Sequence, residues 1–266
     1  HYVAPTVWAY KEKRAEKTAK LFDEILCILP WEPPYFEKHG MKAHFIGHPI
    51  FEDFPQYDES KLNQTKKEFN INDDDIIISV LPGSRKGEVE KLFPIFADAI
   101  KILQEKYTNL KPFILGTYDL ENKLKEEVKN IKNSRLIIKP EVKSAILQLS
   151  NSAIVKSGTI SLEVAAAKWP HIICYKISPV SAWLLKQMVK INYANLINIS
   201  ADSEIIPELI QEKCTAENIS KELTNILENK TIANEQVKLS QKEIEKITKI
   251  EPSKKAAEII LSQNIN

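Results

Sequence analysis

Short apolar runs of β-type residues alternate with stretches of helical period along most of this chain, and this alternation limits its fold more than any other feature. The clearest runs lie at residues 76–81, 112–115, 136–138, 153–155 and 171–175. Helical patterns separate them at 88–105, 120–131, 142–149 and 160–168. Because parallel strands need crossover helices, this order predicts an α/β fold. We expect an open, doubly wound parallel sheet, followed by a helical C-terminal tail from Ser203 onward.

The N-terminal residues carry a weaker form of the same pattern. A charged helix is expected over residues 8–22, with strands at 24–29 and 43–46. A polar stretch without a strong period then runs from residue 52 to 63 and contains Pro55. Such stretches are typical of domain boundaries. We therefore predict two parts, residues 1–54 and residues 55–266.

Composition excludes several classes of function. The formal net charge of +1, from 37 basic and 36 acidic side chains, gives no electrostatic basis for binding nucleic acid. Cys27, Cys174 and Cys214 lie far apart, so neither a disulfide framework nor a zinc site is predicted, and a reducing cytoplasm fits best. No apolar run approaches the ~18 residues of a membrane span, so we expect membrane contact to be peripheral. The chain opens on His1 and Tyr2 directly in a strand, from which we expect upstream residues to be missing.

Ligands of open parallel sheets bind beyond the carboxyl ends of the strands, and the first polar loop at such a place is Leu81-Pro82-Gly83-Ser84-Arg85. Gly83 lets the backbone approach a ligand, Ser84 can cap the next helix, and Arg85 offers a bidentate fork for phosphate. The same residues are equally typical of a Pro-Gly turn with an arginine in solvent.

A second loop, Lys156-Ser157-Gly158-Thr159, precedes the helix that contains Glu163. The free N–H groups and the dipole at a helix start favour a diphosphate. Glu163 follows Thr159 by four residues, so the two share nearly one face, and the carboxylate can accept bonds from vicinal ribose hydroxyls. On these residues alone, an ordinary capped helix with a solvated glutamate is the better-supported alternative.

Three further polar residues are weaker candidates for contact with a ligand or for acid–base catalysis. Asn198, taken as a loop asparagine at a strand end, and Gln211 in the PELIQ segment can fix a base or sugar, but asparagine is equally common in plain turns. His48, between Gly47 and Pro49, suits acid–base work, although a satisfied inter-domain histidine is the better-supported reading.

Several signatures of cofactor and metal chemistry are missing from the sequence. It contains no G-x-G-x-x-G, Walker A, H-E-x-x-H or G-x-S-x-G pattern, which are signals of dinucleotide, ATP, zinc-protease and hydrolase chemistry. We therefore expect binding of a phosphorylated ligand without metal or cofactor.

Five segments, in order, resemble the lipid-A-disaccharide synthases over essentially the whole chain. They are HYVAPTVWAY at residues 1–10, FIGHP at 45–49, LPGSRKGEVE at 81–90, SGTISLE at 157–163, and Asn198 with PELIQ at 207–211. Two departures stand out. Ala201-Asp202-Ser203 replaces the family's Ala-Gly-Arg, and Ile197 replaces the proline that the family has before the asparagine.

The resemblance implies the GT-B architecture, with two Rossmann-like domains and the active site between them. Residues 1–54 would be the end of the acceptor-binding domain with the linker, and residues 55–266 the UDP-sugar domain. The family's presumed catalytic base would lie before His1, so no catalytic residue is named here and the fragment alone is expected to be inactive.

The implied activity is that of an inverting hexosyltransferase of lipid A and lipopolysaccharide biosynthesis in Gram-negative bacteria. It joins UDP-2,3-diacylglucosamine to 2,3-diacylglucosamine 1-phosphate, giving the β(1→6) disaccharide 1-phosphate and UDP. The implied UDP-sugar contacts are spread over three loops: Gly83, Ser84, Arg85, Ser157, Gly158, Thr159, Glu163, Asn198 and Gln211. The alternatives are another GT-B enzyme acting on UDP-GlcNAc (a 2-epimerase or the peptidoglycan N-acetylglucosaminyltransferase) and a non-catalytic nucleotide-sugar sensor.

Acylated substrates imply a cytoplasmic enzyme peripheral on the inner membrane, and a homodimer is compatible with the sequence. The amphipathic stretch at residues 179–190 is a candidate contact, with Trp183 and Met188 on its apolar side and Lys186 and Lys190 supplying charge. Packing of that apolar side on the sheet is the better-supported alternative.

Overall fold

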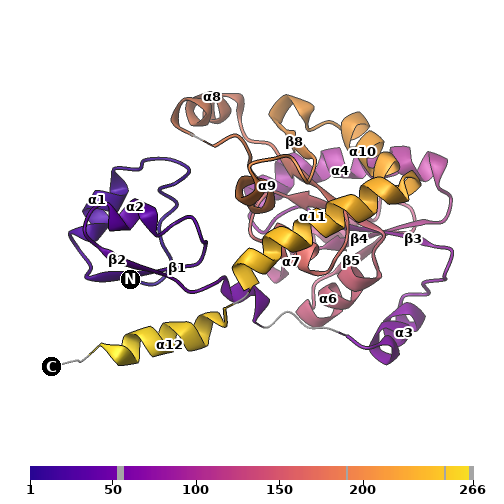
Figure 1. Cartoon of the computed structure of the whole chain (residues 1–266). Helices are drawn as coiled ribbons and strands as arrows, with labels where there is room; N and C mark the ends of the chain where they lie inside the picture. The colour runs from indigo at the N-terminus through magenta and orange to yellow at the C-terminus, as the bar shows by residue number, and fades with distance from the viewer. Residues whose placement is uncertain (53–56, 190, 249, 264–266) are drawn as a thin grey trace. The chain divides into compact units, whose positions relative to one another are not determined.

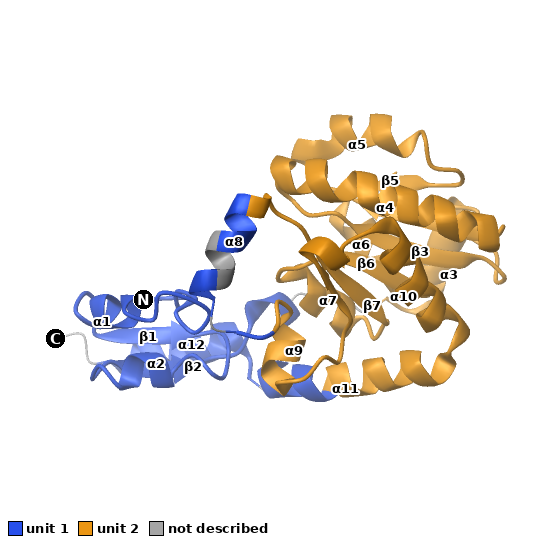
Figure 2. Ribbon diagram, turned by 90° about the horizontal axis from the view of Figure 1, so that it is seen from above, with its two compact units in different colours: residues 1–54, 180–192, 242–266 blue, residues 55–179, 193–241 orange. Residues whose placement is uncertain are grey.

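The structure, a computed structural model, describes residues 1–52, 57–189, 191–248 and 250–263, without the side chains of residues 184–186. It contains two compact units (Figure 2). Unit 1 comprises residues 1–54, 180–192 and 242–266, and unit 2 comprises residues 55–179 and 193–241. The boundary predicted near residue 55 falls within 53–56, outside the described residues. Segments 180–192 and 242–266 are grouped with the N-terminal residues.

Unit 2 is built on one parallel sheet (Figure 1). Its strands are β3 (Ile76–Leu81), β4 (Leu110–Leu115), β5 (Arg135–Ile137), β6 (Ser152–Lys156), β7 (His171–Tyr175) and β8 (Glu208–Ile210). They lie in the order β5-β4-β3-β6-β7-β8, and every pair is parallel. The first strand of unit 2, β3, lies in the middle of the sheet. The next two strands, β4 and β5, are added on one side of it, and β6, β7 and β8 on the other. The predicted doubly wound sheet is therefore confirmed.

Helices cover both faces of this sheet because its strands are apolar on both sides. The helices of unit 2 are α3 (Glu59–Glu68), α4 (Lys86–Lys106), α5 (Glu121–Val128), α6 (Pro140–Leu149), α7 (Ile160–Ala166), α9 (Leu196–Ala201), α10 (Ala216–Glu228) and part of α11 (Lys230–Thr248). On one face, Ile78 and Val80 join the core formed with α4 and α10. On the other face, the hydroxyls of Ser79 and Ser150 lie 2.7 Å apart, which fixes the end of α6 against β3.

Unit 1 holds a two-stranded parallel sheet, β1 (Glu24–Cys27) with β2 (Lys42–Phe45). Its helical elements are α1 (Arg14–Ala19), α2 (Pro34–Glu37), the 3₁₀ turn η1 (Pro49–Phe51), most of α8 (Pro179–Met188), the end of α11, and α12 (Pro252–Ser262). A small core forms around Ile25, Phe36 and Met41. The helical tail predicted for the C-terminus is present as α10, α11 and α12.

Three local predictions were wrong for identifiable reasons. The helix expected at 8–22 shrinks to α1, because Lys11 has φ +53° and the Trp8 indole donates to Glu32 (3.2 Å) instead of standing on a helix face. The segment at 195–199 is not a strand end. Asn195 Oδ1 accepts from the N–H of Ile197 (2.7 Å) and so starts helix α9. Finally, β8 lies within the region expected to be wholly helical, since its three residues are too few to show a period.

Candidate functional site

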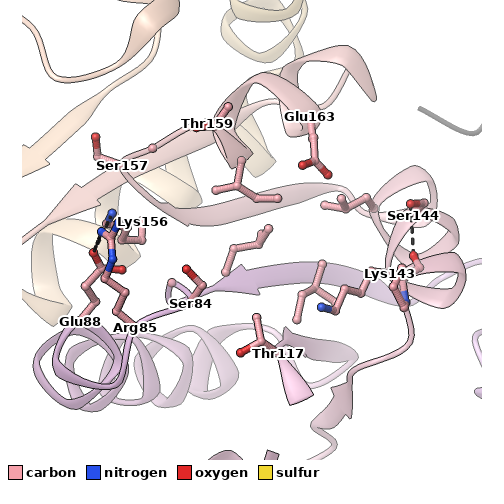
Figure 3. A pocket seen from close by; sticks show the side chains of 17 residues that line it. Ser84, Arg85, Glu88, Thr117, Lys143, Ser144, Lys156, Ser157, Thr159 and Glu163 are labelled. Carbon is pink, nitrogen blue, oxygen red and sulfur yellow. Dashed lines mark hydrogen bonds and ion pairs between the residues drawn. The ribbon is translucent and has the colours of Figure 1, made fainter. Parts of the chain in front are cut away.

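A pocket of about 570 Å³ opens at the carboxyl ends of β3 and β6, the two central strands. These strands flank the point where the order of the sheet reverses, which is where doubly wound sheets bind their ligands. Figure 3 shows Arg85, Glu88 and Lys156 together at one side of the pocket, and Glu163 and Lys143 at the opposite side. Seven residues predicted from the sequence line it: Gly83, Ser84, Arg85, Ser157, Gly158, Thr159 and Glu163.

The loop after β3 forms one wall of the pocket. Gly83 has φ +113°, and a Cβ at that position would lie 2.8 Å from Glu88 Oε2, so both the backbone and the space require glycine. The expectation that Ser84 caps the next helix was wrong. Helix α4 begins at Lys86 with Arg85 at the N-cap, and Ser84 lies one residue too early. Ser84 is exposed and lines the pocket instead.

Two cations share one carboxylate at this end of the pocket. Arg85 Nη1 lies 2.9 Å from Glu88 Oε1, and Lys156 Nζ lies 3.1 Å from the same oxygen. Burial acts to raise the pKa of the Glu88 carboxyl, but the bonds to Lys156 and Arg85 outweigh it and lower the pKa overall. Glu88 is therefore ionised at neutral pH. It neutralises one of the two positive charges and leaves a net charge of +1 facing the pocket.

The loop after β6 forms the adjoining wall. Ser157 is anchored on both sides, because its N–H donates to the Cys174 carbonyl (2.9 Å) and its hydroxyl to the Ala194 carbonyl (3.1 Å). Helix α7 follows, and the Thr159 side chain makes no capping bond to it. Among the described residues, the N–H groups of Gly158 and Thr159 have no hydrogen-bond partner. This loop therefore presents two backbone donors and a hydroxyl to the pocket.

Glu163 and Lys143, from α7 and α6, lie at the other end of the pocket (Figure 3). Thr117, from the loop after β4, also lines the pocket. Burial raises the pKa of the Glu163 carboxyl, and the charge of Lys143 opposes that change. Burial likewise lowers the pKa of the Lys143 ammonium, and Glu163 opposes it. The two charges thus influence each other, but no ion pair within 4 Å joins them in the described part of the chain.

Asn198 and Gln211 do not line this pocket. The Asn198 amide is fully buried, donates to Ile206 O (2.8 Å) and Glu208 Oε1 (2.9 Å), and accepts two backbone N–H groups. Gln211 follows β8, and its Oε1 accepts from Ile177 N–H at 3.4 Å. In this structure both side chains hold backbone segments together. Their assignment as donor-sugar contacts stays a prediction.

The motifs in unit 1 also make structural contacts. Glu32 is buried and accepts from Trp8 Nε1 and from the N–H groups of Ile28 and Leu29. His48 is buried, its Nδ1 accepts from Ile50 N–H (3.2 Å), and burial lowers its pKa to about 4. Among the residues described, no group of three or more His, Cys, Asp or Glu side chains is placed to hold a metal ion.

The profile of the family described as lipid-A-disaccharide synthetase matches residues 1–262. The lipid-A-disaccharide synthase of Rickettsia felis is 40% identical over 264 residues, covering 98% of this chain and 66% of that protein.

The chain belongs to the lipid-A-disaccharide synthetase family. It spans about two thirds of the length of the curated relatives that it matches. Among solved structures, the S. aureus MnaA-UDP co-structure matches with a TM-score of 0.65 at 12% identity, covering 91% of this chain and 61% of that one. WaaG, a glycosyltransferase involved in lipopolysaccharide biosynthesis, matches with a TM-score of 0.59 at 15% identity, covering 89% and 62%. These structural likenesses concern the fold, and they confirm the predicted GT-B class.

One departure from the family pattern now has a structural explanation. Asp202 stands where the family has the glycine of Ala-Gly-Arg, and it takes φ +48° as the left-handed C-cap of α9. Glycine is the usual residue at such a cap, and aspartate is among the few others that tolerate this conformation. Asp202 therefore makes the left-handed turn that ends α9 without a glycine.

Several charged or polar pocket residues were assigned no role from the sequence, among them Lys156, Glu88, Thr117 and Lys143. The first three could have been identified from their positions in the sequence. Lys156 directly precedes Ser157, Glu88 follows Arg85 by one helical turn, and Thr117 follows the end of β4. Lys143 could not, because it lies inside a helix and reaches the pocket only through the packing of α6 on the sheet.

Proposed function

We propose that the full-length protein transfers 2,3-diacylglucosamine from UDP to the 6-hydroxyl of 2,3-diacylglucosamine 1-phosphate, and that unit 2 binds the donor nucleotide. Membership of the family over residues 1–262 carries this proposal. The pocket at the centre of the sheet supports it, because it offers cations and backbone donors for a diphosphate and a carboxylate for a ribose. The MnaA structure with the same fold was determined with UDP.

The residues have distinct roles in this proposal. Arg85 and Lys156 neutralise the diphosphate, while Ser84, Thr159 and the N–H groups after Ser157 donate hydrogen bonds to it. Gly83 keeps the wall open so that the phosphates can approach. Glu163 accepts bonds from the two ribose hydroxyls. Asn198 and Gln211 are proposed contacts on the donor-sugar side.

The reaction inverts the anomeric carbon. The acceptor 6-hydroxyl oxygen attacks C1 of the donor sugar on the face opposite UDP, the bond from C1 to the phosphate oxygen breaks, and its electron pair leaves with UDP. The hydroxyl proton passes to a base. The contribution of this chain is electrostatic, because preorganised cations and N–H groups stabilise the negative charge that develops on the leaving diphosphate. We assign the base to no residue of this chain.

The decisive experiment measures UDP release by the full-length protein with both acylated substrates. Product formation that requires the 2,3-diacyl chains on donor and acceptor supports the proposal. Turnover of UDP-GlcNAc without an acceptor would indicate an epimerase, and transfer to a peptidoglycan precursor would indicate the other GT-B alternative. Nucleotide binding without turnover of any acceptor would indicate a sensor.

We further propose that the protein works on the cytoplasmic side of the inner membrane as a peripheral protein. Within the described residues, no helix is both long and apolar enough to cross a bilayer. Helix α8 exposes 78% of Val180 and 66% of Trp183, and an exposed tryptophan suits a membrane interface. The side chains of Leu184 and Lys186, and all of Lys190, lie outside the described residues. Sedimentation with anionic vesicles, with and without salt, tests this attachment. A Trp183→Ser and Met188→Ser variant that is folded yet binds unchanged would exclude this helix as the contact.

We also propose that the full-length protein is a homodimer. Sedimentation equilibrium of the full-length protein distinguishes it from a monomer.

A further inference from the structure

The segment at residues 11–20, which contains α1, holds a local excess of positive charge. It carries five basic and two acidic side chains, whereas the whole chain has a formal net charge of only +1. The remaining residues together are therefore net negative. A surplus of this kind attracts anionic partners, although the composition of the whole chain conceals it.

The fold places three of these cations on one side of α1, which belongs to unit 1 (Figure 2). Ala15 is fully buried in the core of unit 1 and marks the inward face of the helix. Lys13 and Lys20 flank α1 and keep helical dihedral angles. With ~3.6 residues per turn, both project with Lys17 from the face opposite Ala15. All three lysines are exposed.

The two acidic side chains of the segment do not cancel its charge. Glu16 pairs with Lys20 (2.7 Å), and Glu12 pairs with Lys38 at the end of α2. Each carboxylate offsets one cation, and Lys38 adds a further cation beside α1. Exposed ion pairs of this kind contribute little to stability. The fold of unit 1 therefore does not account for so many cations at this place.

An exposed apolar side chain lies among the lysines. Leu21 follows Lys17 by four residues, and its N–H donates to the Thr18 carbonyl (3.0 Å), so it continues the outward face. It is 74% exposed. The adjacent Phe22 is also exposed and stacks on the His1 ring. Anionic bilayers bind this combination, with ammonium groups at the headgroups and an apolar side chain between them.

We propose that Lys13, Lys17, Lys20 and Leu21, called here the α1 surface, bind anionic lipid headgroups and hold the full-length protein on the bilayer. An acidic peptide would satisfy the lysines but leave Leu21 in water, whereas a bilayer accommodates both. This inference rests on the proposed peripheral attachment and deepens it. It adds an electrostatic contact in a part of the chain separate from α8.

The test is sedimentation of the full-length protein with vesicles of phosphatidylglycerol and phosphatidylcholine. The α1 variant combines Lys13→Gln, Lys17→Gln and Lys20→Gln, because glutamine keeps a similar helix propensity without the charge. At low salt it should bind on the order of a hundredfold more weakly, from roughly fivefold per lysine near an anionic surface. At about 1 M salt this difference should disappear. Leu21→Ser should cause a smaller loss that persists in salt.

A matched control removes the same charge from unit 2. It combines Lys101→Gln, Lys125→Gln and Lys129→Gln, three exposed lysines outside the α1 surface, and it should bind as wild type does. Equal losses in the two triple variants would overturn the proposal, because binding would then follow net charge alone. Soluble polyglutamate bound as tightly as vesicles, with no effect of Leu21→Ser, would also overturn it and assign the surface to an acidic protein.

Activity assays separate this inference from the reaction. With both lipid substrates in detergent micelles, the α1 variant should turn over at the wild-type rate, because its three lysines do not line the pocket. With substrates in anionic vesicles it should be slower. Wild-type vesicle binding by a variant with unchanged circular dichroism would overturn the inference and leave the peripheral attachment standing. If wild-type protein binds no vesicles, both fall, and turnover in detergent decides the transferase proposal separately.

Discussion

We expect protonation of the buried His171 ring to destabilise unit 2 at acid pH. His171 is the first residue of β7 and is 1% exposed. Its Nδ1 lies 3.1 Å from the Trp169 carbonyl, to which the neutral ring donates a hydrogen bond, while Nε2 is buried without a partner among the described atoms. Gln236 holds the strand in place by bonding both the N–H and the carbonyl of His171. Protonation would therefore place a charged N–H in a site that offers it no acceptor.

The size of the effect follows from the difference in pKa. Burial lowers the pKa of His171 from 6.5 to about 4, against a smaller opposing effect of the Trp169 bond. Between those two values the unfolded chain binds the proton and the folded chain does not, so stability falls as pH falls. The contribution is fully present above about pH 6.5, and roughly 2 kcal/mol of it is lost between pH 7.5 and pH 5. The complete loss, reached below pH 4, is on the order of 3 kcal/mol.

The assay is urea unfolding at pH 7.5 and pH 5.0, followed by a probe within unit 2. We expect His171→Gln, which keeps a donor but cannot become charged, to lose about 2 kcal/mol less than wild type over this range. His39→Gln, which removes an exposed histidine in unit 1, serves as the control and should follow wild type. Equal losses of stability in wild type and His171→Gln would refute the reasoning and place a proton acceptor near Nε2.

Three further outcomes test the site. Arg85→Ala and Glu163→Ala should each reduce turnover by about tenfold to a hundredfold while leaving thermal stability unchanged, since both are charged groups at the pocket surface and not core residues; wild-type kinetics in both would remove the assignment. The 266-residue chain alone should form no disaccharide from the two lipid substrates; measurable product would show that the base lies within it. Gly83→Ala should lower both stability and UDP affinity, by ~1 kcal/mol or more in stability, because its Cβ would displace Glu88 from Arg85; an unchanged melting temperature and affinity would contradict the close approach.

The central strands and the two loops that follow them could be predicted from the sequence for a physical reason. Buried parallel strands are continuous apolar runs, so β3 and β6 stand out, and the residues after them must lie at one edge of the sheet. This reasoning was sufficient to predict that Arg85 and Glu163 lie at the same ligand-binding edge of the sheet. The order of the strands cannot be inferred from their amino-acid composition, because it depends on how the crossover helices pack. Lys143 therefore could not be found, since only the packing of α6 places it opposite Glu163.

Asn198 shows why membership of a motif does not by itself establish contact with a ligand. Its amide is satisfied by Glu208 and by backbone groups at residues 205 and 206, and the same carboxylate accepts the N–H groups of Ala194 and Asn195. Ala194 in turn accepts the hydroxyl of Ser157 in the pocket wall. A chain of hydrogen bonds thus runs from the PELIQ segment to the proposed phosphate loop. Asparagine at 198 is required by this network even if it never touches the sugar, because replacing either Asn198 or Glu208 leaves buried polar groups unpaired.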